Sequence, residues 1–186
     1  MDISKNNIIF VSRNQIKSLT NKKIESKMAT RSFIGVVVNP QDNGKTISPS
    51  LELLGKDIES HLAEAEFHDT VIEDSTKVIR IYHHWDGYPD GVGKTLLEEF
   101  NSYEKAINLI AFGDASDING TTAVFYNSWR EGEDWKTTKP RQYTSEQAYE
   151  ESCDEDYAYL FKDGKWYVKN CWSDDNTDWK AVEEVI

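Results

Sequence analysis

The chain has 186 residues, 38% of them hydrophobic and 29% charged, and it holds 22 aromatic side chains, six of which are Trp. This length favours one domain with a sizeable core, and the composition excludes a disordered or collagen-like protein. No apolar run approaches the roughly 18 residues of a membrane-spanning helix, and none near the start is long enough for a signal peptide. We therefore expect a cytoplasmic protein that does not bind membranes.

The net charge of −12 is unevenly distributed. Residues 1–27 hold six basic and two acidic side chains, a net charge of +4, so the other 159 residues carry −16. These 159 residues are acidic enough to repel nucleic-acid phosphates and to attract basic partners. We predict no direct nucleic-acid binding, and we divide the chain into a basic extension, 1–27, and one acidic domain, 28–186.

The first half of the chain predicts strands separated by helical and polar segments. β-Branched and alternating apolar residues indicate the strands. The expected strands are 8–11, 33–38 and 77–83, with a polar turn at 41–45. The expected helices are 14–23 and one that Ser50 caps, with an apolar stripe of Leu51, Leu54, Ile58, Leu62 and Ala65.

The second half is expected to alternate short helices with strands. A glycine-rich loop leads into a helix over 94–100. A second helix is expected to begin at Asn101, with Glu104 completing a capping box, and to end at Gly113. A strand over 121–126, a polar loop over 129–141 and a short helix begun by Thr144 with Gln147 follow. A last helix is expected from Asp178 to the end.

The segment YAYLFKDGKWYVKN gives the clearest local structure. Asp163 and Gly164 fit a two-residue type I′ turn, which sets Lys162 opposite Lys165 and Phe161 opposite Trp166. One face of this hairpin should be core, namely Tyr157, Tyr159, Phe161, Trp166 and Val168. The other face, with Leu160 and Tyr167, should be half covered or in solvent. The fold class is α+β, with a mainly antiparallel sheet of about four to six strands and helices on one face.

Cys153 and Cys171 flank this hairpin, and the fold can bring them near each other. They form no CxxC motif and have no His at zinc spacing. In a reducing compartment two free thiols are expected. We predict no metal and no cofactor.

The densest cluster of chemically capable side chains is HHWDGYP, residues 83–89. On a strand, His83 and His84 point to opposite faces, so one should face the core with a hydrogen bond. The structural interpretation makes Asp86–Gly87 a turn with Trp85 and Tyr88 packed under it. The functional interpretation makes His84 and Asp86 an acid and base pair, or the aromatic side chains a ligand platform. The candidate ligand-binding residues are His84, Trp85, Asp86, Tyr88, Lys94 and Arg141.

Two nucleotide- or metal-binding motifs fail on spacing. A phosphate-binding loop ending at Gly93 and Lys94 needs its first glycine at position 88, which is Tyr88. A calcium loop beginning at Asp174 needs Gly where Trp179 stands and Glu where Val185 stands. Neither activity is predicted.

Acidic residues interleaved with Trp indicate a protein-binding surface, because Trp is enriched at binding hot spots. The candidate partner-binding residues are Trp129, Glu131, Glu133, Asp134, Trp135, Trp172, Asp174 and Asp175.

Several blocks of the sequence resemble a widespread family of small bacteriophage and prophage proteins with no assigned function. In order they are MATRS at Met28, IYHHWDGYPDGVGKTLLEEF, LIAFGDAS, GEDWKTTKPRQY and YAYLFKDGKWYV, and they span most of residues 28–169. The chain departs from the family in its 27-residue preface and in a long helical segment between the first two strong strands. The resemblance implies a phage setting and makes 84–89 the central motif, but it implies no chemistry.

The leading hypothesis is a non-enzymatic phage accessory protein that binds, and modulates or inhibits, a basic host protein of a defence or nucleic-acid-handling system. A second is a small-ligand or nucleotide-binding protein, or a hydrolase, that uses the HHWDGYP turn. A third is a virion or scaffold component. The sequence leaves the oligomeric state open.

Overall fold

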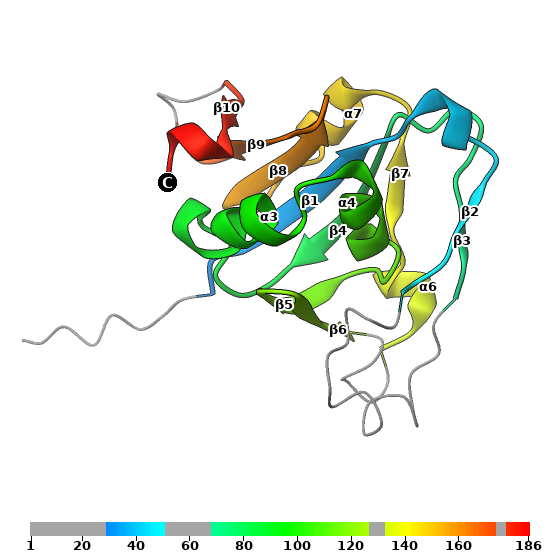
Figure 1. Cartoon of the computed structure of the whole chain (residues 1–186), viewed down its shortest axis with the longest axis horizontal. Helices are drawn as coiled ribbons and strands as arrows, with labels where there is room; N and C mark the ends of the chain where they lie inside the picture. The colour runs from blue at the N-terminus through cyan, green and yellow to red at the C-terminus, as the bar shows by residue number, and fades with distance from the viewer. Residues whose placement is uncertain (1–28, 51–67, 127–132, 174–177) are drawn as a thin grey trace, which may run out of the picture.

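A computed structural model describes residues 29–50, 68–126, 133–173 and 178–186. These residues form an eight-stranded mixed sheet and a separate two-stranded ribbon (Figure 1). The sheet order is β10-β9-β8-β1-β4-β5-β6, and β7 pairs with β4 beside β5. The ribbon pairs β2 (Thr46–Ile47) with β3 (Thr70–Val71). The predicted α+β class is confirmed, but the sheet has more strands than predicted.

The centre of the sheet is β1 (Ser32–Val37), which lies between β4 (Val78–His83) and β8 (Tyr157–Lys162). It runs antiparallel to β4 and parallel to β8. The strands predicted at 33–38 and 77–83 are therefore confirmed as β1 and β4. β1 and β8 come from opposite ends of the described chain, so their pairing joins residues that are far apart in the sequence.

The predicted hairpin joins β8 to β9 (Lys165–Asn170), with Lys162 opposite Lys165 and Phe161 opposite Trp166 as expected. Asp163 and Gly164 both have the positive φ that a type I′ turn requires. The chain ends in β10 (Lys180–Ala181) and a 3₁₀ turn, Val182–Glu184. The predicted C-terminal helix from Asp178 is therefore wrong, because the segment instead extends the sheet beside β9.

Strand β4 changes partner along its second edge. Its first half pairs with β7 (Arg141–Tyr143), whereas His83 pairs with β5 (Ala115–Asn119). β5 continues as a hairpin into β6 (Thr122–Phe125). The sequence predicted β6 but missed β5 and β7, because both are short and polar.

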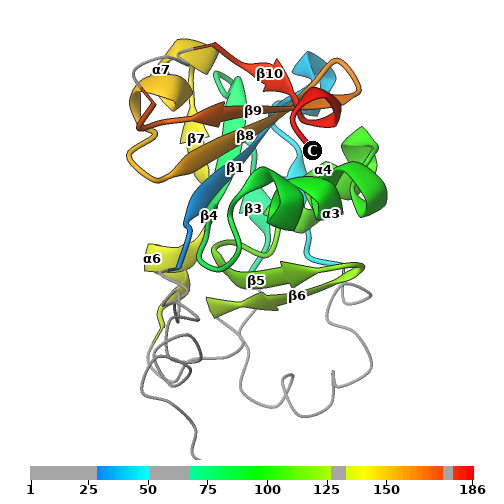
Figure 2. The ribbon, with the colours of Figure 1, turned by 90° about the vertical axis from the view of Figure 1, so that its left-hand side faces the viewer.

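The sheet is covered on both faces (Figure 2). One face packs against α3 (Lys94–Glu99) and α4 (Tyr103–Ile110) and carries the larger core, including Ile34, Ile81, Tyr159 and Trp166. The opposite face packs against α7 (Glu146–Glu151), whose Tyr149 lies in a second cluster: Phe33, Val78, Tyr149, Ala158 and Leu160. The expectation of helices on one face only is thus corrected, and Leu160, expected to be half covered, is only 4% exposed.

The helix α3 begins at Lys94 as predicted, but α4 and α7 begin one residue later than predicted. Ser102, rather than Asn101, caps α4 by accepting the amide of Lys105, and Ser145, rather than Thr144, caps α7 by accepting that of Ala148. Ser is a stronger cap than Thr, which agrees with the choice at α7. The helix α6 (Trp135–Thr138) interrupts the loop predicted over 129–141. The whole 1–27 extension, with the elements expected at 8–11 and 14–23, and the helix expected over 51–65 lie outside the described residues.

Candidate functional site

The two histidines of the HHWDGYP segment face opposite sides of the sheet. His83 is fully buried, and its Nδ1 lies 3.1 Å from the Ser32 Oγ. Burial lowers the pKa of His83 to about 3, so its ring is neutral at physiological pH. The prediction that one histidine is a hydrogen-bonded core residue is confirmed for His83.

His84 lies on the other face within an aromatic cluster, which consists of Tyr82, His84, Trp85 and Tyr126. The Tyr82 hydroxyl is 2.7 Å from the His84 Nδ1, and the ring of Trp85 meets that of His84 edge to face at 4.7 Å. Burial raises the pKa of Tyr82 above its usual range. Trp85 remains 42% exposed, so the cluster ends at the surface.

The Asp86–Gly87 turn is held by backbone hydrogen bonds. Asp86 has a positive φ of 55°, and its carbonyl accepts the amide of Val92 at 2.8 Å. The Gly87 amide donates to the Thr30 carbonyl, and the Gly87 carbonyl accepts the buried Tyr159 hydroxyl at 2.9 Å. The turn therefore joins the start of β1, the start of α3 and the core.

Tyr88 and Pro89 continue this structural role. The Tyr88 carbonyl accepts a hydrogen bond from the Gly91 amide. The Tyr88 ring packs so closely on Gly91 that a Cβ added to this glycine would lie 3.1 Å from the ring. Pro89 begins a π-helical turn, Pro89–Gly93, that leads directly into α3. This geometry favours the structural interpretation of the motif, which the sequence left open.

The two cations predicted to hold an anion are both paired with carboxylates. Arg141 donates to both oxygens of Asp114, at 3.0 and 3.2 Å, and to the Thr137 carbonyl. Lys94 lies 3.8 Å from Glu98 in an exposed pair on α3.

Sequence reasoning missed Asp114, which is 6% exposed and stands where β4 exchanges β7 for β5. Its carboxylate accepts a hydrogen bond from the backbone amide of Tyr82 at 2.8 Å. The side chain thus gives this amide of β4 the acceptor that neither β5 nor β7 provides. Burial raises the pKa of Asp114, against the opposing effects of the Tyr82 amide and Arg141. Asp114 thus accepts hydrogen bonds from Arg141 and from the Tyr82 backbone amide, whereas the Tyr82 hydroxyl separately contacts His84. In the sequence Asp114 is the last residue of the segment LIAFGD, and nothing in that segment indicates that it would bond β4.

A cavity of about 550 Å³ lies between the η1 turn (Pro40–Asp42), the ribbon and α4. It is lined by amides, carboxylates and three Ile side chains, and no predicted site residue lines it. Within it Asp42 pairs with Lys45 at 2.8 Å, and burial raises the pKa of Tyr103 to about 12. The described residues gather no group of three His, Cys, Asp or Glu side chains that could hold a metal ion, and none of their helices has the length and apolarity to cross a membrane.

The predicted partner-binding residues that the structure describes fall into two groups, one at α6 and one after β9. Asp134 caps α6 by accepting the Lys136 amide, and Trp135 is half-buried, with its ring 5.7 Å from that of His68. Trp172, in contrast, is 68% exposed. Trp172 lies two residues after the end of β9, and β9 and α6 lie on different sides of the molecule (Figure 1). Trp129, Glu131, Asp174 and Asp175 lie outside the described residues, and Glu133 is half-buried beside Asp134.

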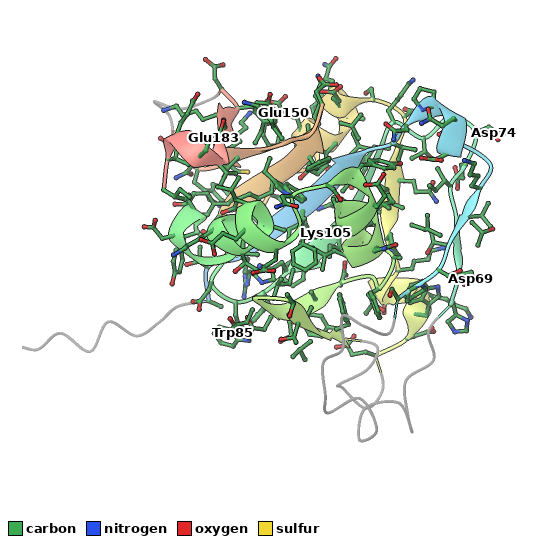
Figure 3. All side chains as sticks on the ribbon, in the orientation of Figure 1. Asp69, Asp74, Trp85, Lys105, Glu150 and Glu183 are labelled. Carbon is green, nitrogen blue, oxygen red and sulfur yellow. The ribbon has the colours of Figure 1, made fainter. Side chains whose placement is uncertain are left out.

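Trp172 stands beside the most acidic run of the described chain. Residues 150–156 read EESCDED, with five carboxylates and no basic side chain. The Cys171 amide donates to the Asp156 carbonyl at 3.0 Å, which places Trp172 next to this run. We call residues 150–156 together with Trp172 the acidic edge. In Figure 3 Glu150 lies near the top of the view and Trp85 near the bottom. The other end of the run comes close to the HHWDGYP turn, because Asp156 accepts the amide of Arg31, whose neighbour Thr30 accepts that of Gly87.

The carboxylates of the acidic edge differ in their surroundings. Burial raises the pKa of Glu155, which Arg31 opposes and Asp154 and Asp156 reinforce. Glu151 and Asp154 are exposed and point away from the core. Lys169 pairs with Glu150, so one of the five carboxylates is neutralised there by a described lysine.

Comparison with known proteins adds no assignment: no family model, no curated sequence and no solved structure matches the chain.

Proposed function

We propose that this protein is a binding protein without enzymatic activity, whose acidic edge docks on a basic surface of another protein. The resemblance to phage proteins makes a host protein, of a defence or nucleic-acid-handling system, the expected partner, and modulation or inhibition of that protein the expected outcome. The proposed docking surface is the acidic edge, which includes Trp172.

The observation that supports the proposal is the exposure of Trp172 within a field of carboxylates. It is the most exposed large hydrophobic side chain of the described residues, at 68%. Exposed Trp side chains surrounded by charge are typical of interface hot spots, where the ring supplies the affinity and the charges steer the encounter. The net charge of −16 outside residues 1–27 extends that field over the body.

The alternative of a ligand site or hydrolase at HHWDGYP has less support. The backbone of Asp86 and Gly87 is committed to the fold by hydrogen bonds to Val92, Thr30 and Tyr159. The two cations that would hold an anion have carboxylate partners. Nothing in the described geometry favours the virion or scaffold alternative.

The test is affinity capture from a bacterial lysate at low and at high salt, followed by binding measurements with the purified captured protein. The double variant Glu151→Lys with Asp154→Lys should lower the association rate about tenfold at low salt and less at high salt, because steering is screened. Both side chains are exposed, so the variant should fold.

The matched control is Asp74→Lys, which reverses a charge in an exposed turn far from the acidic edge (Figure 3). It should leave the association rate within twofold of the wild-type value. Equal effects of the control and the double variant, or no salt-sensitive partner at all, would contradict the proposal.

A further inference from the structure

Cys153 and Cys171 lie together on the face of the sheet that α7 covers. Both are half-buried and pack against the cluster around Tyr149. The Cys153 thiol donates to the Tyr149 carbonyl at 3.3 Å. Cys171 follows β9, where its amide donates to Asp156, three residues after Cys153.

Independent contacts hold the two segments against each other at this point. The ion pair of Lys169 with Glu150 joins the end of β9 to the end of α7. The indole of Trp179 stacks on Tyr149 at 6.1 Å and reaches Glu150. Each thiol is the largest single influence on the pKa of the other, in keeping with their packing against the same cluster. Their proximity is thus fixed by elements on both sides.

We infer that Cys153 and Cys171 form a dithiol site that closes to an intramolecular disulfide when it meets a low-molecular-weight disulfide such as oxidised glutathione. The bond would tie the end of α7 to the end of β9 and enclose the β8–β9 hairpin. Cys153 belongs to the acidic edge and Cys171 precedes Trp172, but the inference does not depend on partner binding.

The chemistry assigns different roles to the two sulfurs. The neighbouring Cys153 thiol lowers the pKa of Cys171, whereas the neighbouring Cys171 and burial raise the pKa of Cys153. The Cys171 thiolate therefore attacks one glutathione sulfur, and the S–S bond breaks to release one glutathione thiolate. Cys153 gives its proton to solvent and attacks the Cys171 sulfur, which releases the second glutathione. The protein dithiol is oxidised to a disulfide as oxidised glutathione is reduced to two thiols.

The test equilibrates the full chain with mixtures of reduced and oxidised glutathione, blocks remaining thiols, and maps peptides by mass spectrometry. The expected product is a monomer with a Cys153–Cys171 crosslink, reversed by excess reduced glutathione. Oxidation should raise the melting temperature by about 5 to 10 °C, as expected for a loop of this size. A product with only glutathione adducts, or with disulfide-linked dimers, would overturn the inference.

Two single variants separate the roles of the sulfurs. Cys153→Ser should trap a stable glutathione adduct on Cys171, because no second thiol can displace it. Cys171→Ser should react at Cys153 at least tenfold more slowly, because its thiol stays protonated. Equal rates would overturn the assignment of Cys171 as the attacking sulfur.

Discussion

The HHWDGYP turn and the acidic edge contrast in how the fold uses their side chains. The turn holds the residue types that chemistry favours, yet His83 is buried and neutral, and the backbone of Asp86 and Gly87 is hydrogen-bonded to Val92, Thr30 and Tyr159. The acidic edge holds no reactive arrangement for hydrolysis, yet its Trp172 and two of its carboxylates remain at the surface. A cluster of reactive residue types is therefore a weaker sign of function than groups that the fold leaves available.

The largest effect is expected from Gly87→Ala. A Cβ at this position would lie 2.7 Å from the Thr30 carbonyl oxygen and 2.8 Å from the Arg31 carbonyl carbon. Because backbone must move to admit it, we expect a loss of about 3 kcal/mol of unfolding free energy in urea titrations. Gly164→Ala is the control, since it has a positive φ but no neighbour within 4 Å, and should cost only about 1 kcal/mol. Equal losses would show that the turn is not sterically constrained.

The next effect is the pH dependence caused by His83. Its folded pKa, about 3, lies below its unfolded value of about 6.5. The contribution of neutral His83 to the free energy of unfolding is therefore fully present above about pH 6.5. It is lost as the pH falls toward 3, by up to about 1.4 kcal/mol per pH unit. Between pH 6.5 and 5 the loss should approach about 2 kcal/mol in urea titrations.

His83→Gln isolates this contribution from those of the carboxyl groups. The variant should be less stable at pH 7 but should lose less stability than the wild-type protein between pH 7 and pH 5. Parallel pH profiles for the two proteins would contradict a neutral, buried His83.

Two exposed Trp residues provide a direct comparison of the regions. Trp172→Ala should weaken binding of the captured partner about tenfold, mainly by faster dissociation measured by surface plasmon resonance. Trp85→Ala removes the ring that is 42% exposed at the turn and should leave the affinity within twofold. The reverse order of effects would transfer the binding site to the aromatic cluster.

The smallest effect is expected from Asp134→Ala. The side chain caps α6 through the Lys136 amide, and loss of such a cap costs about 1 kcal/mol. Thermal unfolding should show this loss, while partner affinity should stay unchanged. A large loss of affinity with normal stability would restore Asp134 to the binding surface that the sequence predicted.

Patterns with strong local causes were predictable from the sequence. β-Branched runs marked β1 and β4, and the Asp163–Gly164 turn fixed the register of the β8–β9 hairpin. The short strands β5 and β7 carry no such pattern. They exist because β4 offers them its second edge, and Asp114 supplies the acceptor between them.

The candidate site was predictable only in part. The opposite orientation of His83 and His84 follows from strand geometry, and the exposure of Trp172 agrees with the predicted partner-binding role. The burial of Trp135 against His68 depends on a tertiary contact, as does the pairing of Arg141 with Asp114. The acidic run 150–156 was visible, but its place beside Trp172 required the β8–β9 pairing.

The position of β1 between β4 and β8 also governs how the chain is made. Arg31 and Asp156, which meet where β1 and β8 begin, are 125 positions apart. During synthesis β1 must wait with one hydrogen-bonding edge open until β8 leaves the ribosome, and such distant closure slows folding. A chain that stops before Tyr157 would keep this edge exposed, ready to pair with another copy and aggregate.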